Sequence, residues 1–218
     1  MIELPADRYH TPLRFTALGL WITAVGGVYL LGDLLWSLLV GPVSGAGILV
    51  LFVVALFGAQ PLAGWAEKQL ITRWPSGRAV QLEGGRLTLR EKTGLAPFDL
   101  SQKINYWRWR FEIRSRRGGR VPNGHFCFAI RLVQGEAVAS LYTFFSPEQS
   151  KGIHTRYPAY DLRPVASKAP SPLGGRDAVY LAAEHERWDV GAELDPADFE
   201  KLLTHLAAHV PDFVAPNS

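Results

Sequence analysis

The sequence is poor in cysteine and, over one long stretch, in charge. Its 218 residues include a single cysteine, Cys127, which excludes an intramolecular disulfide. One free thiol fits a reducing compartment. Between Phe15 and Trp65 only Asp33 carries a charge, and no comparable stretch follows. The chain is therefore expected to divide into an apolar N-terminal part and a polar remainder.

The uncharged stretch contains two apolar runs, over residues 15–40 and 45–65. Each is close to the ~20 residues that a helix needs to cross the hydrocarbon core of a bilayer. The residues between them read GPVSG, a composition typical of a tight turn. The sequence thus predicts a transmembrane helical hairpin within residues 1–74. A cleaved signal peptide is disfavoured, because the first run is too long and a second follows at once.

Lysine and arginine lie on both outer flanks of these runs and are missing from the connecting loop. The flanking residues are Arg8, Arg14, Lys68, Arg73 and Arg78. Basic flanks remain on the cytoplasmic side of a membrane. We therefore expect a multi-pass protein of the cell inner (plasma) membrane with both termini in the cytoplasm.

Two features inside the spans are candidates for function. Asp33 is the intramembrane polar residue, and its position late in the first span favours an interfacial or partner-bonded carboxylate over a proton relay. Small residues also recur at a spacing of four, which lets helices approach closely. They are Gly19, Thr23 and Gly27 in the first span and Ala55, Ala59 and Ala63 in the second. They indicate packing inside the hairpin, or else oligomerisation or docking on a larger membrane complex.

Short alternating strands are predicted after the apolar part. Leucine and valine alternate with polar residues over 79–90 around a turn at Gly84-Gly85, which is typical of a β-hairpin. Further strands are expected over residues 104–114, 124–133 and 136–145.

The strand over residues 104–114 shows the strictest alternation. Trp109 and Phe111 are expected to be buried, and Arg108 and Arg110 exposed. Such a pattern predicts a sheet with one buried face and one solvated face.

The last third of the chain is expected to be irregular before it ends in a helix. Residues 146–176 are rich in proline, serine and glycine and are read as a loop-rich insertion, followed by a short strand around 179–182. Asp195 is a good N-cap and Pro196 a good first helical residue, which together predict an amphipathic helix over 195–210.

The stretches RAVQLEGGRLTLRE and FDLSQKINYWRWRFEI, after a two-span hairpin, resemble the opening strands of the bacterial PH-domain (pleckstrin-homology-like) membrane proteins. The resemblance implies a PH-like domain over residues 75–218. The expected fold class is membrane-anchored α+β: a two-helix hairpin, then a mainly antiparallel β domain with a C-terminal amphipathic helix.

Basic residues are concentrated in the first part of the predicted domain. Residues 73–131 contain thirteen Lys or Arg and four Asp or Glu, whereas residues 132–218 contain seven and twelve. Beside a membrane anchor, such a basic region favours anionic lipid headgroups over nucleic acid. The candidate lipid- or partner-binding residues are Arg108, Arg110, Arg114, Arg116, Arg117 and Arg120. Ordinary positive-inside bias on a solvated sheet is the alternative.

The sequence contains no recognisable catalytic, metal-binding or cofactor-binding motif. His205 and His209 have zinc-compatible spacing but lack a third ligand. We therefore expect no enzyme activity, cofactor or metal. An active site assembled from distant residues, such as His125, His154 and Asp161, is the remaining catalytic hypothesis.

Two non-enzymatic functions stay open. The first is a membrane protein whose cytoplasmic domain scaffolds or regulates a protein partner, or a second copy of itself, at the membrane surface. The alternative is an accessory subunit of a membrane transport or electron-transfer complex, with Asp33 and the small residues facing other subunits.

Overall fold

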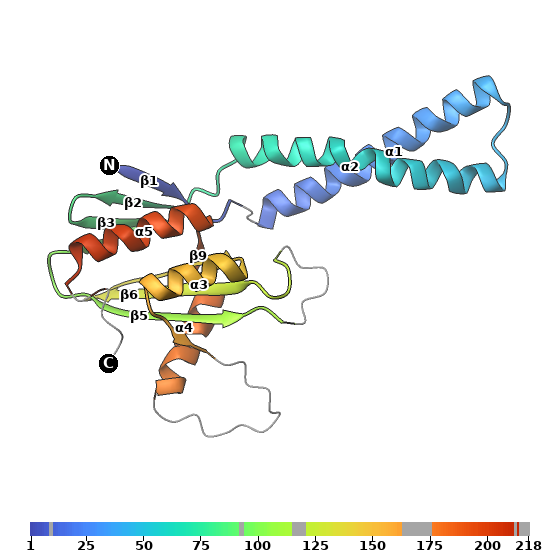
Figure 1. Cartoon of the computed structure of the whole chain (residues 1–218). Coiled ribbons are helices and arrows are strands. Elements are labelled where there is room, and N and C mark those ends of the chain that lie inside the picture. Colours follow the sequence, from blue (N-terminus) through green and yellow to red (C-terminus); the bar gives the residue numbers. More distant parts are fainter. Residues whose placement is uncertain (9–10, 92–93, 115–120, 163–175, 212, 214–218) are drawn as a thin grey trace. The chain divides into compact units, whose positions relative to one another are not determined.

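The chain forms two compact units in a computed structural model (Figure 1). The structure describes residues 1–8, 11–91, 94–114, 121–162, 176–211 and 213. Residues Arg8–Ser76 form one unit, here called the helical unit. Met1–Asp7 and Gly77–Ser218 together form the other, here called the sheet unit. The expected division was residues 1–74 and 75–218. The helical unit instead covers Arg8–Ser76, and the first seven residues belong to the sheet unit.

The helical unit consists of α1 (Thr11–Leu39) and α2 (Gly45–Arg73), which pack against each other. Both helices are long and apolar enough to cross a membrane. Small residues permit the close approach: the δ-carbon of Leu51 lies 3.1 Å from where a Cβ on Gly32 would be. Ala55 and Ala59 are fully buried, as expected of packing inside the hairpin.

The sheet unit contains a four-stranded and a five-stranded sheet. The first has the order β1-β2-β3-β4 and the second the order β8-β5-β6-β7-β9. The strands of the first are β1 (Ile2–Pro5), β2 (Ala79–Glu83), β3 (Arg86–Glu91) and β4 (Gly94–Asp99). Those of the second are β5 (Asn105–Glu112), β6 (Phe126–Gln134), β7 (Ala137–Phe145), β8 (Tyr160–Asp161) and β9 (Ala192–Glu193). The described sheet unit is thus α+β, with antiparallel pairs and two short parallel ones.

Strands β1 and β2 are antiparallel neighbours, although the whole helical unit separates them in sequence. Their register pairs Ile2 with Leu82 and Pro5 with Ala79. Leu4 points into the core and is 2% exposed. Ala6 continues the strand to form a bridge with Leu194, beside the second sheet. The first seven residues therefore connect both sheets.

The main core lies between the two sheets and α5 (Pro196–His209). The predicted hairpin over residues 79–90 is confirmed, with its alternating leucines and valine buried around Gly84-Gly85. The final helix is also confirmed, with Asp195 at the N-cap and Pro196 in the first turn. Its buried face contributes Phe199, Leu202, Leu203 and Leu206.

The expectation of one solvated face for the strand over residues 104–114 is wrong. Trp109 is fully buried as predicted, and Phe111 is half-buried, on the face covered by α4 (Arg176–Val190). The opposite face of the same sheet carries Phe128 and Ile130 and packs into the main core. Helices therefore cover both faces of this sheet.

Two segments expected to lack helices contain them. Residues Pro147–Arg156 form α3, which begins at a capping box between Ser146 and Gln149. The expected strand around residues 179–182 lies within α4 instead, with Tyr180 and Ala183 buried three residues apart. Residues 163–175 of the predicted insertion lie outside the described residues.

Candidate functional site

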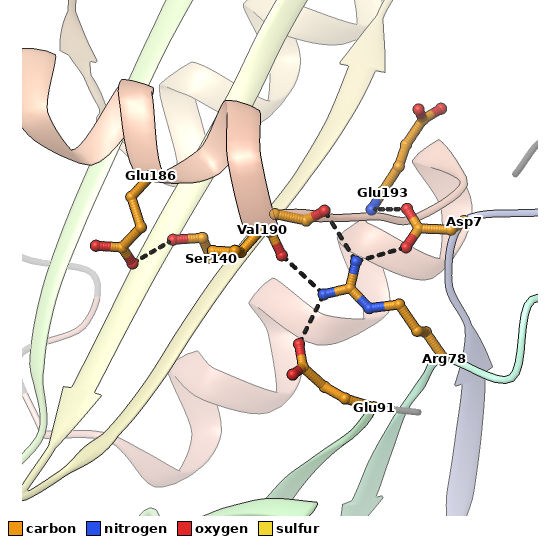
Figure 2. A network of polar contacts seen from close by, with 8 residues as sticks. Asp7, Arg78, Glu91, Ser140, Glu186, Val190 and Glu193 are labelled. Atoms are coloured by element: carbon orange, nitrogen blue, oxygen red, sulfur yellow. Dashed lines mark hydrogen bonds and ion pairs between the residues drawn. The ribbon is translucent and has the colours of Figure 1, made fainter. Parts of the chain in front are cut away.

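A polar network centred on Arg78 closes the sheet unit where the chain leaves for the helices and returns (Figure 2). Arg78 Nη1 donates to Asp7 Oδ2 at 2.7 Å and to the carbonyl of Gly191 at 3.1 Å. Its Nη2 donates to Glu91 Oε1 at 2.7 Å and to the carbonyl of Val190 at 2.8 Å. We call this group, with Glu193, the Arg78 clamp.

Asp7 takes part in the clamp through its backbone as well as its carboxylate. Its N–H donates to the carbonyl of Glu193 at 2.7 Å, and the N–H of Glu193 donates back to Asp7 Oδ1 at 2.9 Å. Asp7 adopts a positive φ of 50°. Asp tolerates this left-handed conformation better than most residues, because its short side chain bonds locally. Asp7 therefore fixes the end of the N-terminal segment against β9.

The clamp also holds the C-terminal end of α4. A cation near the last carbonyls of a helix is favoured by the helix dipole, and Arg78 bonds directly to two carbonyls there. Gly191 closes the helix end, and its N–H donates to the carbonyl of Arg187 at 2.9 Å. A Cβ on Gly191 would lie 2.3 Å from that carbonyl oxygen, so only glycine fits without a backbone shift.

Replacing Arg78 by methionine should lower the free energy of unfolding by about 2 kcal/mol, because charged hydrogen bonds are lost from Asp7 and Glu91. The Arg78 side chain is 19% exposed, so water already screens these interactions and part of the lost stabilisation is compensated by solvent. Arg90→Met is the matched control, since Arg90 makes a single ion pair, with Glu3, that is more exposed to solvent. Chemical denaturation of the full chain in detergent measures both. Equal losses in the two variants would contradict the special role of the clamp.

A second polar network fixes α4 to the five-stranded sheet. The indole N–H of Trp109 donates to Glu184 Oε2 at 2.8 Å, and Arg187 pairs with the same carboxylate. Arg131 of β6 bonds to both oxygens of Glu186, which also accepts from the Ser140 hydroxyl. Two acidic residues of α4, Glu184 and Glu186, thus join the helix to the sheet.

Burial has marked electrostatic effects around Arg187. This side chain is 3% exposed and lies over the ring of Tyr142, 4.5 Å from the centroid. Burial, supported by the nearby Glu193 carboxylate, raises the pKa of Tyr142 to about 12. Burial opposes the charge on Arg187, but its hydrogen bonds to Glu184 raise its pKa overall. Both groups therefore keep their ordinary charge states throughout the physiological range.

The six candidate arginines do not form one exposed face among the described residues. Arg114 is the most exposed, with 68% of its side chain accessible, and it pairs with Glu112. Arg110 is 17% exposed and forms a two-pronged ion pair with Asp161. Arg116, Arg117 and Arg120 lie outside the described residues.

The expectation that Arg108 is exposed is wrong, because its side chain is fully buried. It lies opposite Ile130 on the face toward the main core, and its guanidinium carbon is 4.7 Å from the centre of the Phe213 ring. Burial lowers its pKa. Arg108 therefore acts as a packed core side chain in this fold and has no access to a lipid surface.

Two of the three residues in the catalytic hypothesis, His154 and Asp161, come near each other. Asp161 pairs with Arg110, and both affect His154 electrostatically. Burial lowers the pKa of His154, the Arg110 charge lowers it further, and Asp161 partly offsets this. His154 Nδ1 accepts the N–H of Ala159 at 3.3 Å. His125 instead lies in the turn before β6, where its carbonyl accepts from Ile113.

The other residues singled out from the sequence are Cys127, the pair His205 and His209, and Asp33. Cys127 is fully buried in β6. His205 and His209 lie side by side, with ring centres 4.3 Å apart. Within the part of the chain that the structure describes, no three His, Cys, Asp or Glu side chains come together as a metal site. Asp33 is half-buried in α1.

No protein-family model, curated protein or solved structure matches this chain. The chain has two apolar N-terminal helices followed by a mixed-sheet domain, as the sequence indicated. The more specific resemblance to PH-domain membrane proteins has no match behind it. Sequence reasoning also missed the Arg78 clamp, whose members are scattered from residue 7 to residue 193.

Proposed function

We propose that this chain is an integral membrane protein in which α1 and α2 cross the bilayer and hold the sheet unit at its surface. The observation that carries the proposal is the exposed apolar surface of both helices. Leu30, Leu38 and Phe57 are 67%, 73% and 75% exposed. Apolar surface of this extent is costly in water and is typical of lipid contact.

The pairing of β1 with β2 supports two crossings. These strands flank the helical unit and belong to one sheet, so both must lie on the same side of any membrane that the helices enter. The chain between them must then cross an even number of times. Two spanning helices satisfy this condition, independently of the charge pattern.

The basic flanks favour the cytoplasmic side of the inner membrane for the sheet unit. A reporter fused after Ser218 should therefore behave as cytoplasmic, and one inserted at Ser44 as external. Paired phosphatase and fluorescent-protein fusions measure both positions. Reversed labelling would overturn the orientation, and identical labelling at both positions would overturn the two crossings.

The proposed role is to scaffold or regulate a protein partner at the membrane surface, without catalysis. Its support is that the polar networks of Arg78, Glu184 and Glu186 connect elements of the fold to one another. Arg114 keeps an exposed side chain that is available to anionic lipid or to a partner. Purification from native membranes in mild detergent should recover a stoichiometric partner or a homo-oligomer. Recovery of a monomer alone would count against scaffolding.

An accessory subunit of a larger membrane complex is the second candidate function. Gly19, Thr23 and Gly27 are exposed on α1, so this row of small residues does not pack against α2. It is available to a helix of another protein. Gly27→Leu should then reduce co-purification of the partner, whereas Gly26→Leu, at an exposed position on another side of α1, should not. Equal recovery with both variants would exclude this row as the contact.

A further inference from the structure

The last turn of α4 carries two exposed apolar side chains beside the Arg78 clamp. Trp188 is 65% exposed and Val190 is 57% exposed. The carbonyl of Val190 accepts from Arg78, which also binds Asp7. Asp7 immediately precedes the helical unit, and Arg78 follows it by two residues. The end of α4 is thus fixed at the place where both connections to the helices leave the sheet unit.

We infer that Trp188 and Val190 form a second membrane contact, in which they enter the headgroup region of the bilayer that α1 and α2 cross. This inference rests on the proposed membrane insertion. Its occupant is lipid, because tryptophan is enriched at the membrane–water interface, where its ring is apolar and its N–H can stay hydrated. The contact orients the sheet unit, whereas the helices only tether it.

The length of the N-terminal connection supports the contact. Four residue-to-residue steps lead from Asp7 to Thr11, and four more, now helical, lead from Thr11 to Phe15, where the apolar span begins. At full extension these reach at most about 20 Å from the clamp. The clamp therefore cannot move far from the bilayer, and the side chains around it are the part of the sheet unit with the most restricted distance to lipid.

Exposed apolar residues elsewhere in the sheet unit provide matched controls. Val179 is 47% exposed near the start of α4, about nine residues or ~14 Å along the helix from Trp188. Ile2 is 51% exposed and pairs with Leu82, at the end of β1 away from Asp7. Neither adjoins the clamp, so neither should contact lipid.

Single-cysteine probes on the full chain test the inference. Cys127→Ala removes the one native thiol, which is buried. Trp188→Cys, Val190→Cys, Val179→Cys, Ile2→Cys and Leu30→Cys are then labelled separately with an environment-sensitive fluorophore. Each protein is reconstituted in vesicles of phosphatidylcholine and phosphatidylglycerol, with or without a nitroxide near the top of the acyl chain. Circular dichroism of each variant confirms that it is folded.

We expect the nitroxide to reduce emission severalfold from positions 188 and 190 and to leave positions 179 and 2 unchanged. Position 30, in α1, reports insertion of the helices. Quenching at 30 without quenching at 188 and 190 would overturn the inference and leave the proposed anchoring intact. Absence of quenching at 30 would overturn the anchoring itself. Equal quenching at 188, 179 and 2 would show that the sheet unit lies on lipid without this specific contact.

Discussion

Removing Met1–Asp7 from the sheet unit should lower its free energy of unfolding by at least about 3 kcal/mol, since loss of one buried leucine alone costs 2–5 kcal/mol. Leu4 and Ala6 are 2% and 1% exposed, and both lie in the main core. The strand also pairs with β2 along its length, and Asp7 supplies a carboxylate to the clamp. A soluble fragment that begins at Gly77 lacks all of these interactions.

The experiment compares two soluble proteins in urea denaturation. One contains Gly77–Ser218 alone, and the other has Met1–Asp7 joined to Gly77 by a short Gly/Ser linker in place of the helical unit. A short linker suffices because β1 and β2 are antiparallel neighbours. Leu4→Ala in the joined protein separates the contribution of the core from that of strand pairing. Equal stability of the two proteins would contradict the position of β1.

Trp109→Ala should lower the free energy of unfolding by roughly 3–5 kcal/mol, the usual range for a fully buried large aromatic side chain. The ring packs edge-on against Tyr180, with centroids 6.5 Å apart, and its N–H bonds to Glu184. Both partners belong to α4. The substitution therefore also loosens the attachment of this helix to the sheet.

Two matched variants separate these effects. Trp109→Phe keeps an aromatic ring but loses the hydrogen bond to a carboxylate, at a cost of about 1.5–3 kcal/mol. Trp107→Ala removes a neighbouring ring on the same face that is only half-buried, so its effect should be smaller. Chemical denaturation of the joined soluble protein measures all three. A negligible effect of Trp109→Ala would contradict the packing of α4 on this sheet.

Local patterns predicted those parts of the fold that depend on nearby residues. The two apolar helices, the hairpin at Gly84-Gly85 and the helix that begins after Asp195 are all set by composition, turn chemistry or capping over short distances. The helix α3 was also readable, because Ser146 and Gln149 form a capping box. It was missed because the prolines and glycines around it were read only as helix breakers.

Other features depend on distant residues and left no local signal. Arg108 reads as a solvated strand residue, but Phe213 from the C-terminal end covers it. The Arg78 clamp brings together Asp7, Glu91 and the end of α4, which are far apart in sequence. Alternation also identifies only one buried face per strand, so it could not show that α4 covers one face of the sheet while α5 packs over the other.

The pairing of β1 with β2 has a consequence for biosynthesis. Asp7 and its partner Arg78 are 71 residues apart, and Leu194, which bridges to Ala6, is made later still. Strand β1 therefore leaves the ribosome well before its pairing partners, and its pairing is completed late. If only one of the two helices inserted, β1 and β2 would emerge on opposite sides of the bilayer and could not meet. If α1 and α2 cross a membrane as proposed, completion of the sheet therefore requires both helices to insert, and a chain with only one inserted would expose Leu4 and the edge of β2 to proteases.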